Sequence, residues 1–360
     1  MQIIKHSNIY FAVSGLLVGA SALAVAVFGL ALGIDFTGGS LLEITVDERI
    51  QADIASIQGI LTRADEQGAK LLDSVQAQKT GEAGFLLRFR NVSEEDHQAI
   101  IGRLNTEFAS QLPENERSKE AGSEGAPAGV SGIQATDFEG NPINIEVGTA
   151  DGGVIESPVI TIGGESLVVE DRFESIGPTI GNELKQKSIY AMIAVIVSII
   201  LYIAWAFRKV SDPVSSWKYG ITAIFALVHD VAIPVGVFAV LGAVAGVEVD
   251  ILFVTALLTI LGYSVNDTIV VFDRTRENLS RDHWKHEFEW IVNKSVNETI
   301  RRSVYTALTT FVVLLAVYLF GGESIKHFVL ALMIGVVAGT YSSIFLASPL
   351  LVAWEKRGRR

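Results

Sequence analysis

Six long apolar runs constrain the fold of this chain more than any other feature of its sequence. They lie at about 9–32, 188–207, 219–241, 251–272, 303–320 and 327–353. A membrane helix needs about 20 mostly apolar residues to cross roughly 30 Å of hydrocarbon, and each run is close to that length. The sequence therefore predicts a polytopic α-helical membrane protein with six transmembrane helices.

The first run permits two interpretations, a cleaved signal peptide or a retained helix. One basic residue, Lys5, precedes it. Its apolar stretch is longer than the about 7–15 residues that form the apolar part of a signal peptide. We therefore interpret residues 1–32 as a cytoplasmic N-terminus followed by the first transmembrane helix.

A charged segment, 33–187, separates the first run from the second. It contains 12 Lys and Arg residues against 27 Asp and Glu residues, whereas the rest of the chain contains 16 against 13. The net charge of −12 thus comes from a polar domain, and this acidic balance argues against nucleic-acid binding, which would need a basic patch. The absence of cysteine excludes disulfides, thiol catalysis and cysteine-ligated metal sites.

The distribution of Lys and Arg predicts the orientation of the chain in the membrane. Fifteen of them precede the first run, follow the last run, or lie in the loops 208–218 and 273–302, which share one side if six helices cross the membrane. The opposite loops, 242–250 and 321–326, contain only Lys326. Because basic loops stay on the cytoplasmic side, we expect cytoplasmic termini and an extracytoplasmic polar domain in a multi-pass protein of the cytoplasmic (inner) membrane.

The polar domain shows the pattern of a ferredoxin-like α+β fold, in the order β-α-β-β-α-β. The expected elements are a strand at 40–47, a helix at 49–67, strands at 69–79 and 83–91, a helix at 93–110 that begins after Ser93, and strands at 154–162 and 165–175. Residues 111–153 show no clear period and are interpreted as an irregular insertion. A helix from about Pro178 is expected to run on into the second span, so that 188–360 holds transmembrane helices 2–6 and a basic tail.

Three ionisable residues in or at the ends of the membrane runs stand out: Asp230, Asp267 and Arg302. Such residues are costly in hydrocarbon unless they are paired or hydrated, so they are candidate functional residues. Measured from the centres of their runs at 1.5 Å per residue, Asp267 lies about 9 Å and Arg302 about 13 Å toward the cytoplasm. The two side chains can therefore meet at one level of the bilayer.

Two interpretations of this pair remain open. In the first, protonation of Asp267 releases Arg302 and lets two helices repack, because burial favours a neutral carboxyl while a nearby cation favours the charged one. In the second, the pair is static, and Arg302 extends to the lipid headgroups. Asp230, which follows His229, is either a further proton-coupling residue or a carboxylate capped by a neighbouring Ser or Thr.

Hydroxyl groups and glycines also interrupt the apolar runs. Thr306 and Thr309 share the helix face of Arg302. Hydroxyls of the sixth run either hydrogen-bond to neighbouring helices or carry water for a proton; they are Thr340, Tyr341, Ser342 and Ser343. Glycines of the runs are expected to allow close helix contacts; they are Gly236, Gly262, Gly335 and Gly339.

Several short motifs occur together in this chain. The first run is followed by Asp35-Phe36-Thr37-Gly38-Gly39, and the second is preceded by Gly177-Pro178 and Gly181. Residues 258–278 read L-T-I-L-G-Y-S-V-N-D-T-I-V-V-F-D-R-T-R-E-N, which places Asn266, Asp273 and Arg274 near Asp267. Together with the six runs, these motifs resemble the SecD/SecF family of protein-export membrane subunits. The D-F-T-G-G sequence and the size of the polar domain favour the SecF branch of that family.

This resemblance implies a function in protein export. Members of the SecF branch form a heterodimer with SecD, associate with the SecYEG channel and with YajC or YidC, and resemble the proton-driven RND exporters. They are taken to use the proton-motive force to draw translocating preproteins outward, without a cofactor. By motif matching, the family's proton-linked aspartate falls on Asp267 and its arginine on Arg302.

Three other functions compete with this one. A small-molecule RND-type exporter would need a second subunit, because such exporters have more spans than this chain. A passive scaffold of the translocon would differ only in whether Asp267 binds a proton. An intramembrane aspartyl protease would use Asp230 and Asp267, but residues 264–267 read S-V-N-D rather than G-x-G-D, and no G-x-x-x-x-G-K-[ST] loop indicates ATP hydrolysis. We therefore do not expect an enzyme.

Overall fold

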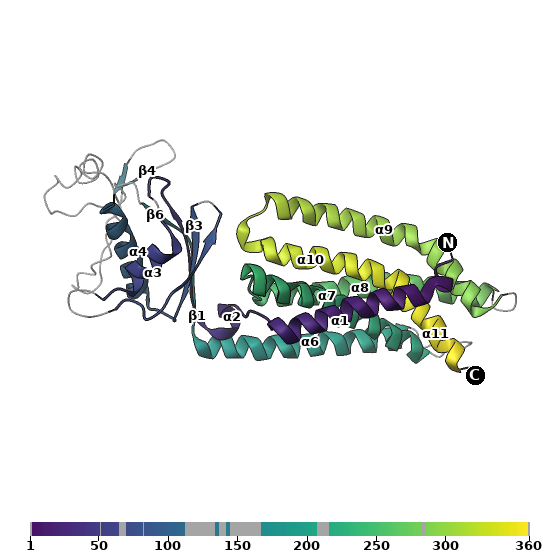
Figure 1. The fold of residues 1–360 in the computed structure, drawn as a ribbon. Helices are drawn as coiled ribbons and strands as arrows, with labels where there is room; N and C mark the ends of the chain where they lie inside the picture. Colours follow the sequence, from purple (N-terminus) through teal and green to yellow (C-terminus); the bar gives the residue numbers. More distant parts are fainter. Residues whose placement is uncertain are drawn as a thin grey trace. The chain divides into compact units, whose positions relative to one another are not determined.

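The chain folds into two compact units, each with its own apolar core. The helical unit consists of Met1–Gly38 and Ile176–Arg360, and the sheet unit consists of Gly39–Ser175 (Figure 1). The structure is a computed structural model that describes residues 2–50, 52–64, 70–81, 83–111, 134–136, 142–144, 167–206, 216–282 and 286–358. The chain thus leaves the helical unit after its first long helix and returns to build the others.

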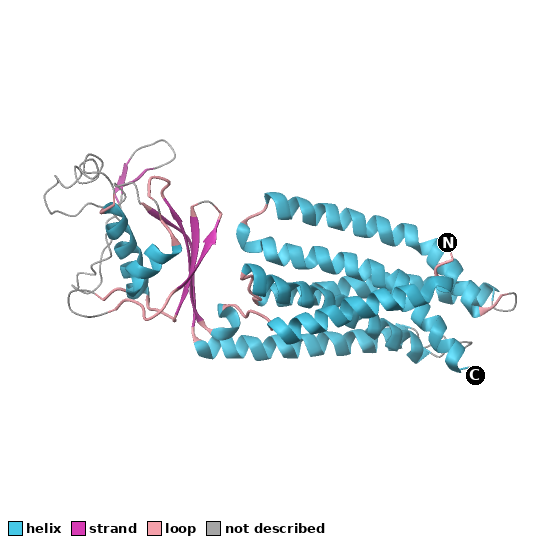
Figure 2. Cartoon of the chain, viewed as in Figure 1, coloured by secondary structure: helices cyan, strands magenta, loops and turns pink. Residues whose placement is uncertain are grey.

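Long helices form the helical unit, drawn in cyan in Figure 2. They are α1 (Ser7–Phe28), α6 (Pro178–Ala206), α7 (Ser216–Ala245), α8 (Ile251–Asp282), α9 (Phe288–Phe320) and α10 (Glu323–Ser342), and a short helix η1 (Ile4–His6) precedes α1. Within the described ranges, six helical stretches are long and apolar enough to cross a membrane. The prediction of six transmembrane helices is confirmed.

The expectation of a long loop at 273–302 is wrong. α8 continues to Asp282 and α9 begins at Phe288, so most of that segment is helical. Its apolar residues recur at helical spacing, and Leu279, Ile291 and Val296 are buried. A helix with one apolar face can carry its charges on the other faces, so the charge that marks this segment does not end the helices.

The helices α7, α8 and α10 form the centre of the helical unit. In the apolar stretches of α7, of α8 and of the last span, which contains α10, between 44% and 61% of the residues are buried. In those of α1, α6 and α9 the buried share is 6–11%. Phe238 of α7 and Phe253 of α8 pack with their ring centroids 4.4 Å apart in one of the buried clusters. The three central helices therefore provide the positions that are shielded from lipid.

Close helix contacts occur at three of the four glycines named for this role. A Cβ atom at Gly236 would lie 2.3 Å from the Ser21 Cβ, and one at Gly335 would lie 2.2 Å from Ile260. At Gly339 the nearest atom, the Ser264 Cβ, would be 3.1 Å away. The expectation is wrong for Gly262, where a Cβ would meet nothing within 4 Å because this residue lies on an exposed face of α8.

A π-helical turn interrupts the last apolar run. α10 ends at Ser342, and Ser343–Ala347 (η2) forms a π-helix before α11 (Ser348–Gly358) begins. The Ser348 hydroxyl donates to the Ser343 carbonyl at 3.2 Å within this turn. Single π-helical turns inside α-helices are uncommon and are frequently found at functional sites.

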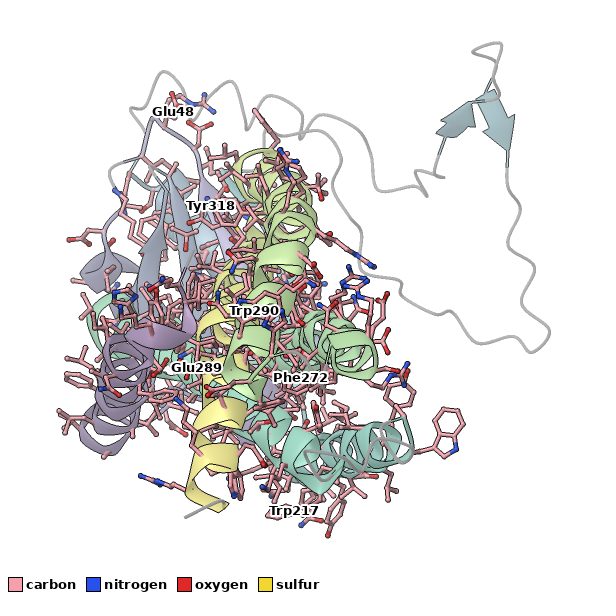
Figure 3. All side chains as sticks on the ribbon, turned by 90° about the vertical axis from the view of Figure 1, so that its right-hand side faces the viewer. Glu48, Trp217, Phe272, Glu289, Trp290 and Tyr318 are labelled. Carbon is pink, nitrogen blue, oxygen red and sulfur yellow. The ribbon has the colours of Figure 1, made fainter. Side chains whose placement is uncertain are left out.

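Aromatic side chains lie at the end of the helical unit that carries both termini (Figure 1); Figure 3, which views the chain from that side, labels Trp217 and Trp290. Trp217 of α7 meets Trp354 of α11 edge-on, with ring centroids 5.2 Å apart. Trp290 of α9 stacks on His286 at 3.7 Å. Tryptophan is enriched at membrane–water interfaces, so these rings are consistent with an interface at this end of the helices.

The sheet unit has the ferredoxin-like topology. Its four-stranded sheet has the order β2–β3–β1–β6, and β3 pairs antiparallel with both β1 and β2. The elements are β1 (Gly39–Val46), α3 (Ile54–Thr62), β2 (Gln76–Thr80), β3 (Gly84–Phe89), α4 (Glu94–Ala109) and β6 (Val168–Ile176). Both helices lie against one face of the sheet (Figure 2), and the predicted fold class is confirmed.

The core of the sheet unit follows the alternation of its strands. Leu42 and Ile44 of β1 are completely buried, whereas Thr45 between Ile44 and Val46 is exposed. Leu87 of β3 pairs with Leu42 in the sheet and is buried as well. Side chains two residues apart in a strand share one face, so this buried set lies on the face that the helices cover.

The helices of the sheet unit begin where their caps dictate. Ser93 accepts a hydrogen bond from the Asp96 N–H at 3.2 Å and caps α4, as predicted. α3 begins at Ile54 rather than at 49, because Asp53 forms a capping box with Ser56. The strand β2 begins at Gln76, later than the expected 69.

The segment 111–153 contains more regular structure than expected. Its described residues include an antiparallel pair of short strands, β4 (Gln134–Thr136) and β5 (Pro142–Asn144). The rest of the expected insertion beyond residue 111, and the strand expected at 154–162, lie outside the described residues.

Candidate functional site

Asp230 lies in the interior of the helical unit, with no exposed surface. Its Oδ2 accepts hydrogen bonds from the hydroxyls of Ser264 on α8 and Ser342 on α10, the latter at 2.7 Å. Its Oδ1 lies 2.9 Å from Nδ1 of the adjacent His229. Neighbouring serines therefore cap this carboxylate, while the role of Asp230 in proton coupling stays a prediction.

Asp267 occupies a second, half-buried position on α8. Its Oδ1 accepts a hydrogen bond from the Ser303 hydroxyl of α9 at 2.6 Å, and its Oδ2 accepts one from the Ser343 hydroxyl at 2.7 Å. One carboxylate thus connects three segments, α8, α9 and the π-helical turn. Sequence reasoning missed Ser303, although its position directly after Arg302 placed a hydroxyl at the level of Asp267.

The two carboxylates meet at consecutive residues of one helix. Ser342 donates to Asp230 and Ser343 donates to Asp267, and the π-helical turn begins at Ser343. These hydroxyls therefore hydrogen-bond across packed helices, one of the two roles left open for them. In the described part of the chain, no group of three or more His, Asp or Glu side chains is placed to hold a metal ion.

Arg302 is exposed on α9, and no ion pair joins it to Asp267 among the described residues. Successive residues of a helix point about 100° apart, so the turn that directs Ser303 toward Asp267 directs Arg302 elsewhere. Thr306 and Thr309 are exposed with it, and Thr309 donates to the Tyr305 carbonyl of its own helix at 3.1 Å. The coupling of Arg302 to Asp267 stays a prediction.

The D-F-T-G-G motif lies at the opposite end of the helical unit from the termini. Asp35 accepts a hydrogen bond from the Ile251 N–H at 2.8 Å, at the first residue of α8. Asp250 accepts one from the Phe253 N–H at 2.7 Å, so two carboxylates cap the same helix. Negative charge at a helix N-terminus is favourable, because the first N–H groups of a helix have no partner within it.

Other residues of this motif pack α2 (Ile34–Thr37) closely against the start of α6. Phe36 is buried in the cluster that contains Phe238 and Phe253. Gly38 has a φ of +74°, and a Cβ there would lie 2.8 Å from Pro178 Cα. A Cβ at Gly181 would likewise lie 3.0 Å from the backbone nitrogen of Gly38.

Three further residues of this set differ in their surroundings. Thr37 donates to the Gly33 carbonyl at 3.0 Å. Gly39 has a φ of +131°, which favours glycine there. At Gly177, by contrast, a Cβ would meet nothing within 4 Å.

The carboxyl of Asp250 has an unusual environment. Burial raises its pKa above the ordinary value, and the nearby charge of Asp35 raises it further, while His327 acts in the opposite direction. The carboxylates of Asp35 and Asp250 both lie at the N-terminus of α8. The helix terminus favours negative charge at each of them, but the two charges repel each other.

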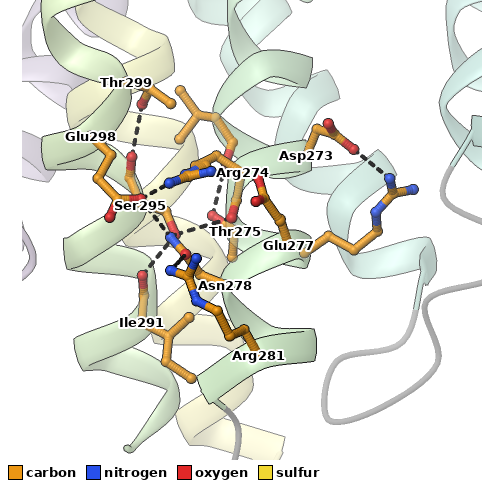
Figure 4. Close-up of polar contacts among 12 residues, drawn as sticks. Asp273, Arg274, Thr275, Glu277, Asn278, Arg281, Ile291, Ser295, Glu298 and Thr299 are labelled. Atoms are coloured by element: carbon orange, nitrogen blue, oxygen red, sulfur yellow. Dashed lines mark hydrogen bonds and ion pairs between the residues drawn. The ribbon is translucent and has the colours of Figure 1, made fainter.

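A polar network joins α8 to α9 beyond their apolar parts (Figure 4). Arg274 contacts Glu298 at 2.6 Å and Glu277 at 2.5 Å. Asn278 is buried and donates to Ser295 and to Glu298, both at 2.9 Å. Arg274, which the motif comparison selected, therefore has a structural role between the two helices.

Two other motif residues lie at the surface. Asn266 is exposed beside Asp267. Asp273 pairs with Arg276 of its own helix at 2.7 Å, and both side chains are about half exposed, at 58% and 44%. An exposed pair of this kind contributes little to stability, so Asp273 is not part of the buried network.

Comparison with known proteins agrees with these features. The sequence matches the family model of the protein export membrane protein SecD/SecF, C-terminal, over residues 163–357 and that of the SecD/SecF GG motif over residues 23–48. The protein translocase subunit SecF of Thermobaculum terrenum is 39% identical over 99% of this chain and 95% of its own length. That of Alicyclobacillus acidocaldarius is 31% identical over 100% of this chain and 94% of its own.

Solved structures indicate the same family. A crystal structure of SecDF from Thermus thermophilus, described as a translocon-associated membrane protein, matches 99% of this chain with a TM-score of 0.69 and 28% identity. This chain spans 39% of that longer chain. A SecDF structure in a super-membrane-facing form matches with a TM-score of 0.58. With its six membrane helices, its ferredoxin-like sheet and its D-F-T-G-G turn, the chain belongs to the SecD/SecF family of protein-export membrane proteins, in the SecF branch.

Proposed function

We propose that this chain is a SecF-type subunit of the Sec protein-export machinery, that it acts with SecD, and that proton binding at Asp267 drives its conformational cycle. The proton-motive force would then draw preproteins across the membrane after their insertion into the SecYEG channel. The names of its relatives, translocase subunits SecF and SecDF, support the role in export. The proton coupling is supported by the surroundings of Asp267.

The observation that carries the proposal is the pair of hydroxyl donors on Asp267. An ionised carboxylate only accepts hydrogen bonds, so it can bind Ser303 and Ser343 at the same time. A protonated carboxyl must donate from one oxygen, and that oxygen can no longer accept the hydroxyl in the same way. Protonation therefore changes one contact between α8 and either α9 or the π-helical turn, and those helices can shift.

Arg302 is proposed to act in another state of the cycle. It is the sequence neighbour of Ser303, whose hydroxyl lies 2.6 Å from Asp267. Its long side chain needs only a rotation of α9 to bring the guanidinium to the carboxylate, because one residue corresponds to about 100° of helix rotation. An arginine that approaches only the ionised Asp267 would couple helix rotation to proton release.

The orientation of the chain is part of the proposal. The Lys and Arg residues of the loops and tail gather with Trp217, Trp290 and Trp354 toward the end that carries both termini. Basic residues are retained on the cytoplasmic side, and tryptophans prefer the interface. We therefore place both termini in the cytoplasm and the sheet unit outside it.

The test replaces Asp267 by Asn in the full chain, together with SecD and SecYEG in membrane vesicles. Asn keeps the size of the side chain but cannot gain or lose a proton in the physiological range. We expect translocation driven by ATP to continue, while the increment from the proton-motive force falls to the level measured with an uncoupler. The matched control is Asp273→Asn, which makes the same chemical change at the surface of the same helix.

Two outcomes contradict the proposal. If the Asp267→Asn protein responds to the proton-motive force like the unmodified protein, Asp267 does not couple protons, and the chain is a passive scaffold of the translocon. If Asp273→Asn causes the same loss, the effect is not specific to the half-buried carboxylate of Asp267.

A further inference from the structure

His229 is buried on α7, with 2% of its surface exposed. Its Nδ1 faces Oδ1 of Asp230 at 2.9 Å, but its buried Nε2 has no hydrogen-bond partner among the residues that the structure describes. Nearly all buried polar atoms in native proteins have a partner, so an orphaned ring nitrogen needs a physical explanation. A site for a proton is the explanation that the surrounding groups favour.

The hydrogen positions follow from the partners. Oδ2 of Asp230 already accepts from Ser264 and Ser342, and an ionised carboxylate has no hydrogen to give. The hydrogen between Oδ1 and Nδ1 therefore belongs to Nδ1, and the neutral imidazole leaves a bare lone pair on Nε2. In this form the pair of His229 and Asp230, called the dyad below, carries one uncompensated negative charge in the membrane interior.

The described side chains that contact the dyad are neutral or acidic. α8 contributes Ser264 and, one turn farther along, Asp267; α10 contributes Ser342 and Tyr341, whose ring stacks on His229 at 5.8 Å. α1 contributes the Tyr10 carbonyl, which accepts from the Tyr341 hydroxyl at 3.2 Å. No Lys or Arg among the described residues is hydrogen-bonded or ion-paired to Asp230.

We propose that His229 and Asp230 form a second proton-binding site, distinct from Asp267, and that the proton binds at Nε2 of His229. One added proton brings the net charge of the dyad to zero, either as an imidazolium beside a carboxylate or as a carboxyl that donates to Nδ1 while Nε2 holds a hydrogen. Both forms place a hydrogen on Nε2 and neither requires another reactant. Burial favours the neutral total charge over the negative one.

This second site extends the proposed function and rests on it for its role in export. Ser342 and Ser343 are consecutive, so the dyad and Asp267 hold adjacent residues at the start of the π-helical turn. A change of protonation at either carboxylate alters a hydrogen bond to the same turn. The helix α10 is thereby connected to two proton sites, the dyad on α7 and Asp267 on α8.

The test observes the imidazole directly, by ¹⁵N NMR of histidine-labelled full-length protein in lipid nanodiscs. The chain contains six histidines, and His229→Gln identifies the resonances of His229 by their loss. A second assignment, in case this variant does not fold, keeps His229 and replaces the other five, which are His6, His97, His283, His286 and His327. We expect the His229 Nε2 signal to change from the unprotonated to the protonated form as the pH falls from about 8 to about 5.

Two variants separate this inference from the proposed function. Asp267→Asn is expected to leave the change at Nε2 in place, whereas Asp230→Asn is expected to abolish it over the same pH range, because the carboxylate that stabilises the added charge is gone. An Nε2 that stays unprotonated throughout this range in the unmodified protein overturns the second site, even if Asp267→Asn abolishes proton-driven translocation. If Nε2 becomes protonated but Asp267→Asn leaves proton-driven translocation unchanged, the second proton site is supported and only its proposed role in export is contradicted.

Discussion

The sheet unit and the helical unit both bury an apolar core, but they differ in the residues that they expose. In the sheet unit most large apolar side chains are buried, such as Leu42, Ile44 and Leu87. In the helical unit Phe320 is 88% exposed, while Asp230 has no exposed surface. Hydrocarbon is as apolar as a leucine side chain, so a membrane helix gains little by hiding its apolar residues. An exposed large apolar residue therefore marks the lipid-facing surface of the helical unit, whereas a buried apolar residue marks a core in either unit.

The largest effect expected from this difference concerns two phenylalanines. Phe85 of β3 is 2% exposed, and Phe85→Ala is expected to lower the free energy of unfolding by about 3–5 kcal/mol, because it removes apolar contacts and leaves a cavity. Phe320→Ala is expected to change it by less than about 0.5 kcal/mol, because its ring packs on no protein core. Urea unfolding of the full chain in detergent, followed by hydrogen exchange of β1 and β3, measures both.

Equal costs for the two substitutions would contradict this contrast. A large cost at Phe320 would show that its ring is covered in the protein as it exists in the micelle. A small cost at Phe85 would show that the sheet unit does not depend on its apolar core.

A medium effect is expected where helices touch through a glycine. A Cβ at Gly236 would lie 2.5 Å from the Cα of Ser21, so Gly236→Ala forces α1 and α7 apart. Overpacking of this kind costs about 1–3 kcal/mol. The loss is measured as a lower midpoint in the unfolding of the helices by SDS, followed by circular dichroism.

Gly262→Ala provides the matched control within the same unit. Its Cβ meets nothing within 4 Å, and alanine favours helix over glycine by about 1 kcal/mol, so the substitution is expected to be neutral or stabilising. The interpretation fails if both alanines destabilise the helices equally, since backbone proximity then does not decide the cost.

The smallest effect is expected at the start of α8. Asp250 has a pKa above its unfolded value of 3.8, so the folded state binds a proton more readily and gains stability as the pH falls through the folded pKa. Asp250→Asn keeps a capping side chain without the charge. We expect the variant to be more stable than the unmodified protein at neutral pH and to lose this advantage in acid.

Thermal unfolding of the two proteins at neutral and acidic pH measures this difference. Because other groups titrate in both proteins, only the difference between the two curves is informative. A constant difference at all pH values would show that the charge of Asp250 is not the cause. Asp250→Ala, which removes the cap as well, separates the loss of the hydrogen bond to Phe253 from the loss of charge.

Hydropathy and alternation predicted most of the fold from the sequence. Six apolar runs gave the six membrane helices, and the cap at Ser93 gave the start of α4 within one residue. These features depend on local sequence, since each helix or strand carries its own pattern. The loop expected at 273–302 was wrong for a related reason: charge reports contact with water, and a helix with Ile291 and Val296 on its inner face can continue into water.

The partners of the two carboxylates were harder to predict. Asp230 and Asp267 were selected by their charge in apolar runs, but Ser303 and Ser264 come from helices whose rotation the sequence does not fix. Arg302 was selected by level along the bilayer normal, which says nothing about the direction of its side chain. A level is set by chain length alone, whereas a contact also requires the rotation of two helices, and packing of the whole bundle sets that rotation.

The π-helical turn at Ser343–Ala347 sets the rotation of the residues that follow it. Relative to an α-helix it accommodates one additional residue in a turn, and one residue corresponds to about 100° of rotation. Removal of one residue from this turn would convert it to an α-helix and rotate everything that follows, so Glu355 would leave Lys218, which it now contacts at 2.7 Å. The phase of the last helix relative to the two aspartates is therefore encoded in a length of chain rather than in any one side chain.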